Sequence, residues 1–470
     1  MTDGFARIRE QLDVPPAFSP EVLAAADASV VAGPQVPPGA PTTIVDARDL
    51  EFVAIDPRGS TDLDQAFFAR RHDRGYTVFY AIADVAAFVA PDDPVDREAR
   101  DRGLTLYSPD LRTSLHPEAI SENAGSLLED QDRRALLWTI DLDHDGVLQD
   151  ARLERADVRN RAQLSYAEAQ AMVGDIDDDH PVALLAEIGP KRVALEAERG
   201  AVSLALPSQE VSANTAGGYD LAYDESFPIE SWNAQISLLT GIAASRIMID
   251  AGVGLLRTLP EPDRRTVGQL RRTANALGIE WRREQSYADR VRELRPDTPQ
   301  RAAMLSQAAR GLRGAGYVAF RDHDLPEHPE HSAIASTYAH VTAPLRRLCD
   351  RFANEIVIAH CAGATPPSWA LEALDELPSL MGSARSRDRN LERAIVDFVE
   401  AVVLEPRVGE TFDAVVTDVD DERDRGRIQL RDPAVVARLP AAGLELGDEV
   451  RVTLLEADPD ARSVRFELAD

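Results

Sequence analysis

Cysteine is scarce in this chain, with two residues, Cys349 and Cys361, among 470. Their spacing does not match a zinc site, and two thiols do not build a disulfide framework. No uninterrupted apolar run approaches the roughly 20 residues that a membrane-spanning helix needs. The first residues, MTDGFARIREQLD, contain acids and no apolar stretch, so they do not form a secretory signal peptide. We therefore expect a cytoplasmic protein that is not bound to a membrane.

Lysine is almost missing as well, because Lys191 is the only one among 51 basic residues. The 81 acidic residues leave a net charge of −30, which repels nucleic acid at long range. A nucleic-acid partner would therefore need a local basic channel or bridging metal ions. Arginine suits such a channel, since it binds phosphate in a bidentate way and stacks on bases. An arginine-rich genome produces the same composition, so both explanations stay open.

The hydrophobic share of 44% and the charged share of 28% are typical of a soluble globular protein. A chain of this length predicts roughly two to four domains. Residues 1–47 predict an N-terminal helical segment and a proline-rich linker, with a second short helix over 20–28. Residues 48–405 mix strands and helices, and residues 406–470 hold short strands between Asp/Gly turns, typical of a small antiparallel barrel. The fold class is therefore α+β.

Hydrophobic periodicity places the individual elements. The predicted strands cover 51–55, a hairpin of 66–70 with 76–85, a pair of 136–142 with 148–158, a segment at 221–228, and barrel strands at 409–416, 426–430, 449–455 and 463–468. The predicted helices cover 93–103, most of 160–205, 232–250, 264–277, 286–294, 299–314, 342–361 and 367–402, while 316–340 is irregular.

An acidic connection lies between the first two predicted strands. Asp56 ends one apolar run, and Asp62 and Asp64 alternate with Leu63 before the next. Like charges placed so closely raise carboxyl pKa values and cost stability, and a divalent cation removes the conflict. Oxygen ligands without nearby His or Cys favour Mg²⁺ or Mn²⁺ over Zn²⁺. A solvated Asp-rich turn explains the same residues, so the spacing alone leaves both interpretations open.

Several motifs occur in one order along the chain. They are Asp56–Asp64, Ile82–Val85, Tyr107–Pro109, Tyr338–Arg347 and the terminal barrel. Together they resemble the RNB-domain ribonucleases, the ribonuclease II/R family of 3′→5′ exoribonucleases. The resemblance covers about residues 48–402, and the barrel at 408–470 is similar to the S1 RNA-binding domain that follows in that family.

This resemblance implies a fold and an activity. The expected fold is an RNB-type catalytic domain of mixed sheet and helices, followed by an OB/S1-like barrel. The expected activity is hydrolysis of single-stranded RNA with release of nucleoside 5′-monophosphates, with Mg²⁺ as cofactor and Mn²⁺ as the alternative. No obligate protein partner is implied.

The resemblance also implies ligands for the metal. Asp56, Asp62 and Asp64 match three of the family's four acidic positions, and Asp64 is expected to be catalytic as well as a metal ligand. The fourth position, normally Asp, is Gln65 here. Its carbonyl oxygen can still bind the metal or a metal-bound water, but it brings no charge. The alternatives are that Gln65 lies outside the ligand shell, or that the site is degenerate and inactive.

Four further residues are expected to contact RNA. Tyr107 matches the loop tyrosine that stacks on a base near the 3′ end, and Arg346 matches the arginine that contacts the reacting phosphate. Arg347 supports Arg346, and Glu392 matches an acid near the nucleotide site. The alternatives are a packed tyrosine under the loop and, for Glu392, an ordinary ion pair on a helix surface.

The chain also departs from the family pattern. The usual Glu-Glu and Ala-Asn pattern of the middle helix is replaced at Ala234–Gly241, and we expect no cold-shock domains before residue 48. Four arginines of the late helix either bind RNA in place of the cold-shock domains or form a solvated helix face. These arginines are Arg385, Arg387, Arg389 and Arg393. Two rival functions remain: a non-catalytic RNA-binding or regulatory protein, suggested by Gln65 and the acidic barrel, and a two-metal phosphodiesterase for another substrate, suggested by the net charge.

Overall fold

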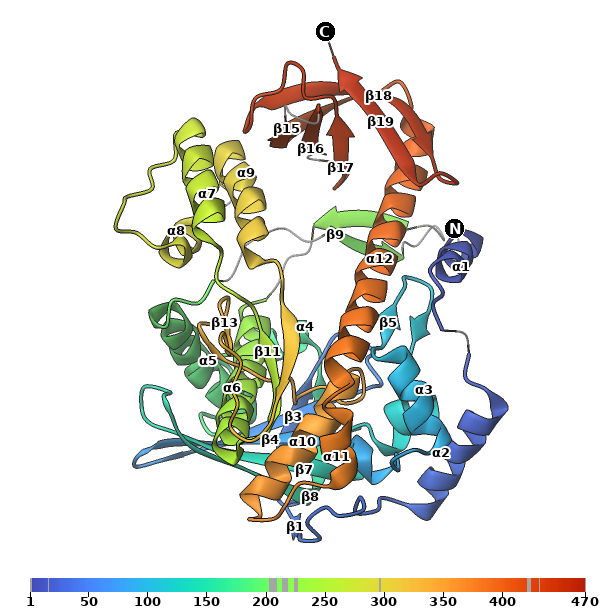
Figure 1. Cartoon of the computed structure of the whole chain (residues 1–470), viewed down its shortest axis with the longest axis vertical. Coiled ribbons are helices and arrows are strands. Elements are labelled where there is room, and N and C mark those ends of the chain that lie inside the picture. Colours follow the sequence, from blue (N-terminus) through green and yellow to red (C-terminus); the bar gives the residue numbers. More distant parts are fainter. Residues whose placement is uncertain are drawn as a thin grey trace.

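The computed structural model describes residues 2–15, 17–202, 209–213, 219–223, 227–295, 297–420, 424–430 and 432–469. Figure 1 shows a broad lower body of sheet and helices and a small barrel at the top, beside the C-terminus. The long helix α12 (Leu377–Leu404) rises from the lower body to the barrel. The first helix of the chain, α1 (Thr2–Gln11), packs beside the upper part of α12. The ring centroids of Phe5 in α1 and Phe398 in α12 lie 5.4 Å apart.

A six-stranded sheet forms the centre of the lower body, with the strand order β1-β8-β2-β3-β4-β7. Its strands are β1 (Ile44–Asp46), β2 (Phe52–Ile55), β3 (Gln65–His72), β4 (Gly75–Ala83), β7 (Asp132–Leu142) and β8 (Leu148–Leu164). The first part of β8 pairs antiparallel with β7, and its last residues pair parallel with β2. Since β8 pairs with both β7 and β2, the strands from β2 to β8 close on themselves. The end of β2 and the start of β3 lie at the same rim of this closed sheet.

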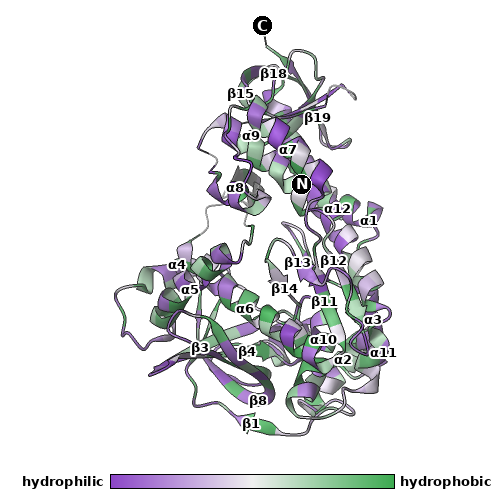
Figure 2. Cartoon of the chain, turned by 60° about the vertical axis from the view of Figure 1, so that its left-hand side comes forward, coloured by the Kyte–Doolittle hydropathy of each residue, from purple (hydrophilic) through white to green (hydrophobic). Residues whose placement is uncertain are grey.

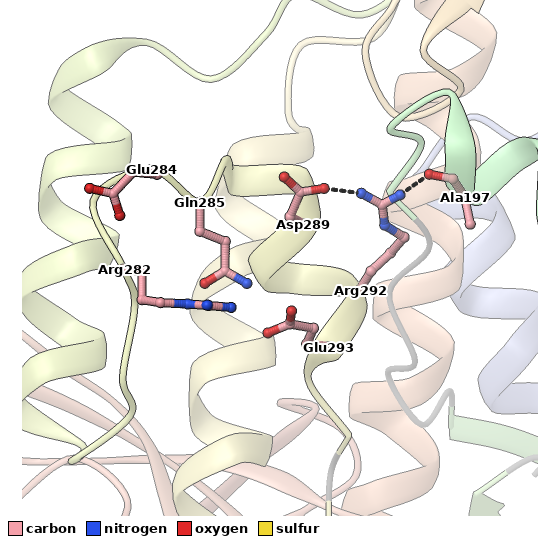
Figure 3. A pocket seen from close by; sticks show the side chains of 7 residues that line it. All are labelled: Ala197, Arg282, Glu284, Gln285, Asp289, Arg292 and Glu293. Carbon is pink, nitrogen blue, oxygen red and sulfur yellow. Dashed lines mark hydrogen bonds and ion pairs between the residues drawn. The ribbon is translucent and has the colours of Figure 1, made fainter.

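Helices cover this sheet. The helices α5 (Pro181–Glu198), α6 (Pro228–Ala251) and α10 (Leu348–Cys361) pack on it and share one large hydrophobic cluster with its strands. Figure 2 shows hydrophobic stretches on α6 and on the strands of the lower body, whereas α8 is largely hydrophilic. Arg155 of β8 is fully buried and pairs with Asp84 at 2.9 Å and with Glu355 of α10. This ion-pair network fixes α10, and hence the segment before it, against the sheet.

The remaining elements lie around this core and above it. The other helices are α2 (Pro20–Ala32), α3 (Pro94–Arg102), α4 (Tyr166–Met172), α7 (Arg264–Ala276), α8 (Tyr287–Glu293), α9 (Pro299–Ala308) and α11 (Ser368–Ala373). Two-stranded ribbons pair β5 (Leu106–Tyr107) with β6 (Arg112–Thr113), β9 (Gln209–Ala213) with β10 (Tyr219–Tyr223), β11 (Gly254–Thr258) with β12 (Gly316–Phe320), and β13 (Glu330–His331) with β14 (Ser336–Thr337).

The C-terminal barrel is an antiparallel sheet of order β17-β16-β15-β18-β19 that is nearly closed. Its strands are β15 (Thr411–Asp420), β16 (Arg425–Leu430), β17 (Val436–Leu439), β18 (Glu449–Asp458) and β19 (Ser463–Leu468). The predicted barrel and the α+β class are confirmed. The three-part division at 47/48 and 405/406 stays a prediction.

Both predicted strand pairs are confirmed as hairpins, β3 with β4 and β7 with β8. Three other predictions are wrong in part. Residues 160–164 continue β8 instead of starting a helix, because they pair with β2, a distant partner that periodicity does not reveal. Residues 316–320 form β12 rather than an irregular segment. In the predicted strand 221–228, residues 224–226 lie outside the described residues, and Pro228 begins α6.

The segment 342–347 is also not helical, although it was predicted as the start of the helix 342–361. Proline disfavours helical geometry in the residue before it, here Ala343, and Pro344 has no N–H to donate. The helix begins only at Leu348. The backbone of this turn is therefore free to bond outside the helix, and it does so in the candidate site.

Candidate metal and RNA site

Asp56 stands at the end of β2, where its backbone N–H still donates to the carbonyl of Leu164 at 3.1 Å. Its side chain is half-buried. Burial raises the pKa of Asp56 to about 6, a shift that the nearby Arg346 reduces and the charge of Asp62 increases. A carboxyl with this pKa gains from a positive partner.

Asp64 directly precedes β3 and is 3% exposed. One oxygen accepts a hydrogen bond from the backbone N–H of Leu345 at 2.8 Å, and the other accepts from Nε of Arg346 at 3.0 Å. Burial raises the pKa of Asp64 to about 7 despite these partners. The non-helical turn before α10 therefore holds Asp64, because the backbone N–H of Leu345 is not used within a helix and is free to donate to the carboxylate.

Asp62 has a partner that the sequence analysis missed. Its carboxylate pairs with Arg112 at 2.5 Å, and Arg112 also pairs with Glu122 and donates to Thr61 at 3.2 Å. Arg112 lies on β6, directly opposite Tyr107 of β5. The sequence analysis did not predict that these two short strands pair. Their pairing places Arg112, a residue of the predicted RNA loop, beside the acidic connection.

Gln65, the residue that departs from the family pattern, is bonded at both ends of its amide. Its oxygen accepts from the Tyr80 hydroxyl at 2.5 Å and from the Ser237 hydroxyl at 3.2 Å, and its nitrogen donates to the Thr342 carbonyl at 2.7 Å. The amide thus joins β3, β4, α6 and the turn before α10. Its oxygen has two lone pairs, and both have donors in this structure.

Tyr107 and Arg346 lie beside the aspartates. Tyr107 is 52% exposed, and the pKa of its hydroxyl is raised to about 12 by burial and by the charge of Asp62. The Arg346 side chain is 44% exposed; burial acts to lower its pKa, but the charges of partners such as Asp64 and Asp56 outweigh it, so the pKa is raised. The structure therefore brings five of the predicted site residues together, and the ring of Tyr107 remains open to a ligand.

Arg347 and Glu392 lie differently. Arg347 turns into the protein and pairs with Asp350, with a closest contact of 2.7 Å, and it lies 3.5 Å from the Thr342 hydroxyl. Asp350 in turn accepts from the Ala343 backbone at 2.7 Å. Glu392 is exposed on α12, and its pKa is raised by burial and by the neighbouring Asp388. Arg347 thus fixes the turn that carries Arg346.

The donor set fits a hard divalent cation. The aspartates offer carboxylate oxygens, and burial holds the pKa values of Asp56 and Asp64 at about 6 and 7, a penalty that a cation would relieve. Arg112 and Arg346 now neutralise two of these acids. Within the described ranges, the one group of three possible ligands whose donor atoms lie within 4.8 Å of one another is His340, Cys349 and Asp350, and the three aspartates do not form such a group. That group combines one carboxylate with an imidazole and a thiol, a softer donor set than Mg²⁺ or Mn²⁺ prefers.

Comparison with known proteins agrees with this architecture. The sequence profile of the RNB domain matches residues 44–362, and that of the RNase II-type exonuclease C-terminal S1 domain matches residues 410–469. The fold is therefore that of an RNB domain followed by an S1-type barrel. The chain belongs to the RNB-domain family.

Among its relatives, ribonuclease R of Escherichia coli is 24% identical over 92% of this chain and 58% of its own length. The human exosome complex exonuclease RRP44 is 29% identical over 68% of this chain and 35% of its own length. The chain thus spans about a third and about three fifths of the length of these two relatives.

Solved structures show the same fold. Ribonuclease R of Mycoplasma genitalium in complex with ribose-methylated single-stranded RNA has a TM-score of 0.86 at 16% identity, covering 99% of this chain and 77% of its own. Yeast Ssd1, a pseudonuclease, has a TM-score of 0.70 at 16% identity, covering 90% of this chain and 53% of its own. Within the described residues, no helix has both the length and the apolar character to cross a membrane.

Proposed function

We propose that this chain is a metal-dependent exoribonuclease that shortens single-stranded RNA from its 3′ end and releases nucleoside 5′-monophosphates. The observation that carries the proposal is the contact of buried Asp64 with Arg346, which joins two distant motifs of the RNB family at one point. The RNB match over residues 44–362 and the RNA-bound ribonuclease R of the same fold support it.

Asp56, Asp62 and Asp64 are the residues that would hold Mg²⁺ or Mn²⁺. When bound, the cation supplies positive charge that orients and polarises the scissile phosphate. Gln65 is the fourth candidate ligand, and its oxygen must give up the hydroxyl of Tyr80 or of Ser237 to serve as one. We infer that its main task is to hold the rim together.

Arg346 and Tyr107 would bind the RNA end. Arg346 uses Nε for Asp64, so its two terminal nitrogens are available to donate to a phosphate and to stabilise its negative charge. The exposed ring of Tyr107 offers a stacking surface that accepts any base, as a non-specific exonuclease needs. Arg347 acts through the turn before α10, and Glu392 is a candidate RNA contact on α12, where its side chain is exposed.

Degradation of single-stranded RNA labelled at its 5′ end tests the proposal. Wild-type protein should shorten the labelled strand stepwise with Mg²⁺ or Mn²⁺ and leave it intact with EDTA. Asp64→Asn should abolish shortening, because an amide neither replaces the charge nor pairs with Arg346 in the same way. Asp101→Asn, an exposed acid of α3, is the matched control and should retain activity. Shortening by the Asp64→Asn protein at the wild-type rate would overturn the proposal.

The alternative is an RNA-binding or regulatory protein with a weakened metal site. It is supported by Gln65, whose oxygen is already bonded twice, and by the fold likeness to the pseudonuclease Ssd1. Binding of the same RNA without shortening favours this alternative. Turnover of another phosphodiester without any effect on RNA favours the third candidate, a phosphodiesterase for a different substrate.

A further inference from the structure

A small pocket lies between the turn that joins β7 to β8, the second half of α5, and α6. Its volume is about 290 Å³. Three arginines line it, Arg192 and Arg199 from the end of α5 and Arg246 from α6, and Glu198 stands at its edge. Apolar side chains complete the wall, among them Val147, Leu195 and Ile242. None of these residues belongs to the aspartate site.

The arginines of this pocket lack acidic partners. Arg192 is 3% exposed and donates to the Gly146 carbonyl at 2.8 Å, but its buried Nε has no partner. The Nε and one terminal nitrogen of Arg199 are likewise buried and unpaired. In the described part of the chain, no ion pair involves Arg192, Arg199 or Arg246. Burying unpaired guanidinium donors is costly, so these groups favour a ligand that accepts hydrogen bonds and carries negative charge.

The local charge is positive although the chain carries a net charge of −30. The pKa of Arg192 is lowered to about 10, mainly by burial and also by the charges of Arg199 and Arg246, while Glu196 opposes the shift. One carboxylate oxygen of Glu196 accepts a hydrogen bond from the Gln235 amide at 2.5 Å. This oxygen is therefore already engaged with a group other than the arginines. Three arginines against one lining glutamate therefore leave a net positive pocket.

We propose that this pocket binds a small phosphate monoester of the size of a nucleoside 5′-monophosphate. The three guanidinium groups would bind the phosphate, since arginine matches its oxygens in bidentate geometry, and the apolar wall would receive the uncharged part. The site is separate from the aspartates. On α6, Ser237 reaches Gln65 and Arg246 follows nine residues later, about 14 Å further along the helix axis.

Equilibrium dialysis of labelled adenosine 5′-monophosphate in EDTA tests the proposal. The double variant Arg199→Gln/Arg246→Gln should bind at least tenfold more weakly than wild type. Arg272→Gln, an exposed arginine of α7, should bind normally, and so should Arg346→Met, which removes a phosphate contact of the aspartate site. Inorganic phosphate should compete, whereas adenosine should not. RNA shortening should be unaffected in the double variant, so the proposal stands or falls apart from the exonuclease function.

Three results would overturn it. The first is wild-type affinity in the double variant, and the second is loss of binding in Arg346→Met alone. The third is displacement of the nucleotide from the Arg346→Met protein by an RNA oligonucleotide without terminal phosphates, because this would indicate a phosphodiester site. Thermal unfolding guards against a misfolded variant. The free Arg199→Gln protein should melt no lower than wild type, because it loses an unpaired buried charge, but adenosine 5′-monophosphate should no longer raise its Tm. A clearly lower Tm would indicate a structural role instead.

Discussion

Restoring the family's acid with Gln65→Asp should make the protein less stable without metal and more responsive to Mg²⁺. The amide of Gln65 now accepts from Tyr80 and Ser237 and donates to the Thr342 carbonyl at 2.7 Å. Aspartate is shorter by one methylene and has no donor. The Thr342 carbonyl would therefore lose its partner, and a further charge would stand beside buried Asp64.

The size of the effect follows from these contacts. An unpaired buried carbonyl costs about 1–3 kcal/mol, and the added like charge raises the total to about 2–4 kcal/mol in EDTA. The same charge favours a divalent cation. If Mg²⁺ binds tenfold more tightly, saturating Mg²⁺ returns about 1.4 kcal/mol more to the variant than to wild type.

Urea unfolding in EDTA and in Mg²⁺ measures both terms, and Gln65→Asn is the matched control because it shortens the side chain without adding charge. Both variants should lose stability in EDTA. Only Gln65→Asp should gain more from Mg²⁺ than wild type does. An equal Mg²⁺ response in the two variants would refute the reasoning that this position belongs to the metal site.

Four further predictions concern stacking, pH and the buried ion pairs. Tyr107→Ala should raise KM for single-stranded RNA about tenfold or more in steady-state assays, since base stacking contributes about 1–3 kcal/mol, whereas Tyr107→Phe should keep the wild-type KM. Because the pKa values of Asp56 and Asp64 are about 6 and 7, protons compete with the metal, and calorimetric titration should find Mg²⁺ affinity about 20-fold weaker at pH 6 than at pH 8. In EDTA both carboxyls hold protons in the folded state above their ordinary value of 3.8, so their contribution to stability should fall as pH rises from about 4 through 7, and a flat profile would contradict the shifts. Arg155→Met should lose about 3–5 kcal/mol in urea unfolding or fail to fold, because it leaves two buried carboxylates unpaired, whereas exposed Arg152→Met should lose less than about 1 kcal/mol.

The acidic connection shows how far the sequence leads. Two short apolar runs were enough to predict β2 and β3, so Asp56 and Asp64 were correctly placed at strand ends. The two arginines that pair with aspartates of this connection, Arg346 and Arg112, differ in how far the sequence predicted them. Arg346 was expected from its motif, but the turn that presents it was predicted as helix, because helical periodicity continues through Leu345 and Leu348 while Pro344 blocks the helix.

Long-range pairing explains what the sequence could not give. Arg112 reaches Asp62 only because β6 pairs with β5, and these are strands of two residues each, too short to show a period. The bonds of Gln65 join residues up to 277 positions apart, so no local pattern predicts them. The burial of Arg192 could not be predicted from the sequence either. It depends on how α5 packs against the turn at Gly146.

Hydrolysis itself is tested most directly by the oxygen that enters the product. Single-stranded RNA is incubated with the protein and Mg²⁺ in water enriched in ¹⁸O, and the released nucleotides are analysed by mass spectrometry. The account predicts nucleoside 5′-monophosphates that carry one ¹⁸O on the phosphate, and none from the Asp64→Asn protein. Nucleotides with a 3′-phosphate or a cyclic phosphate, or no release by the wild-type protein, would contradict it.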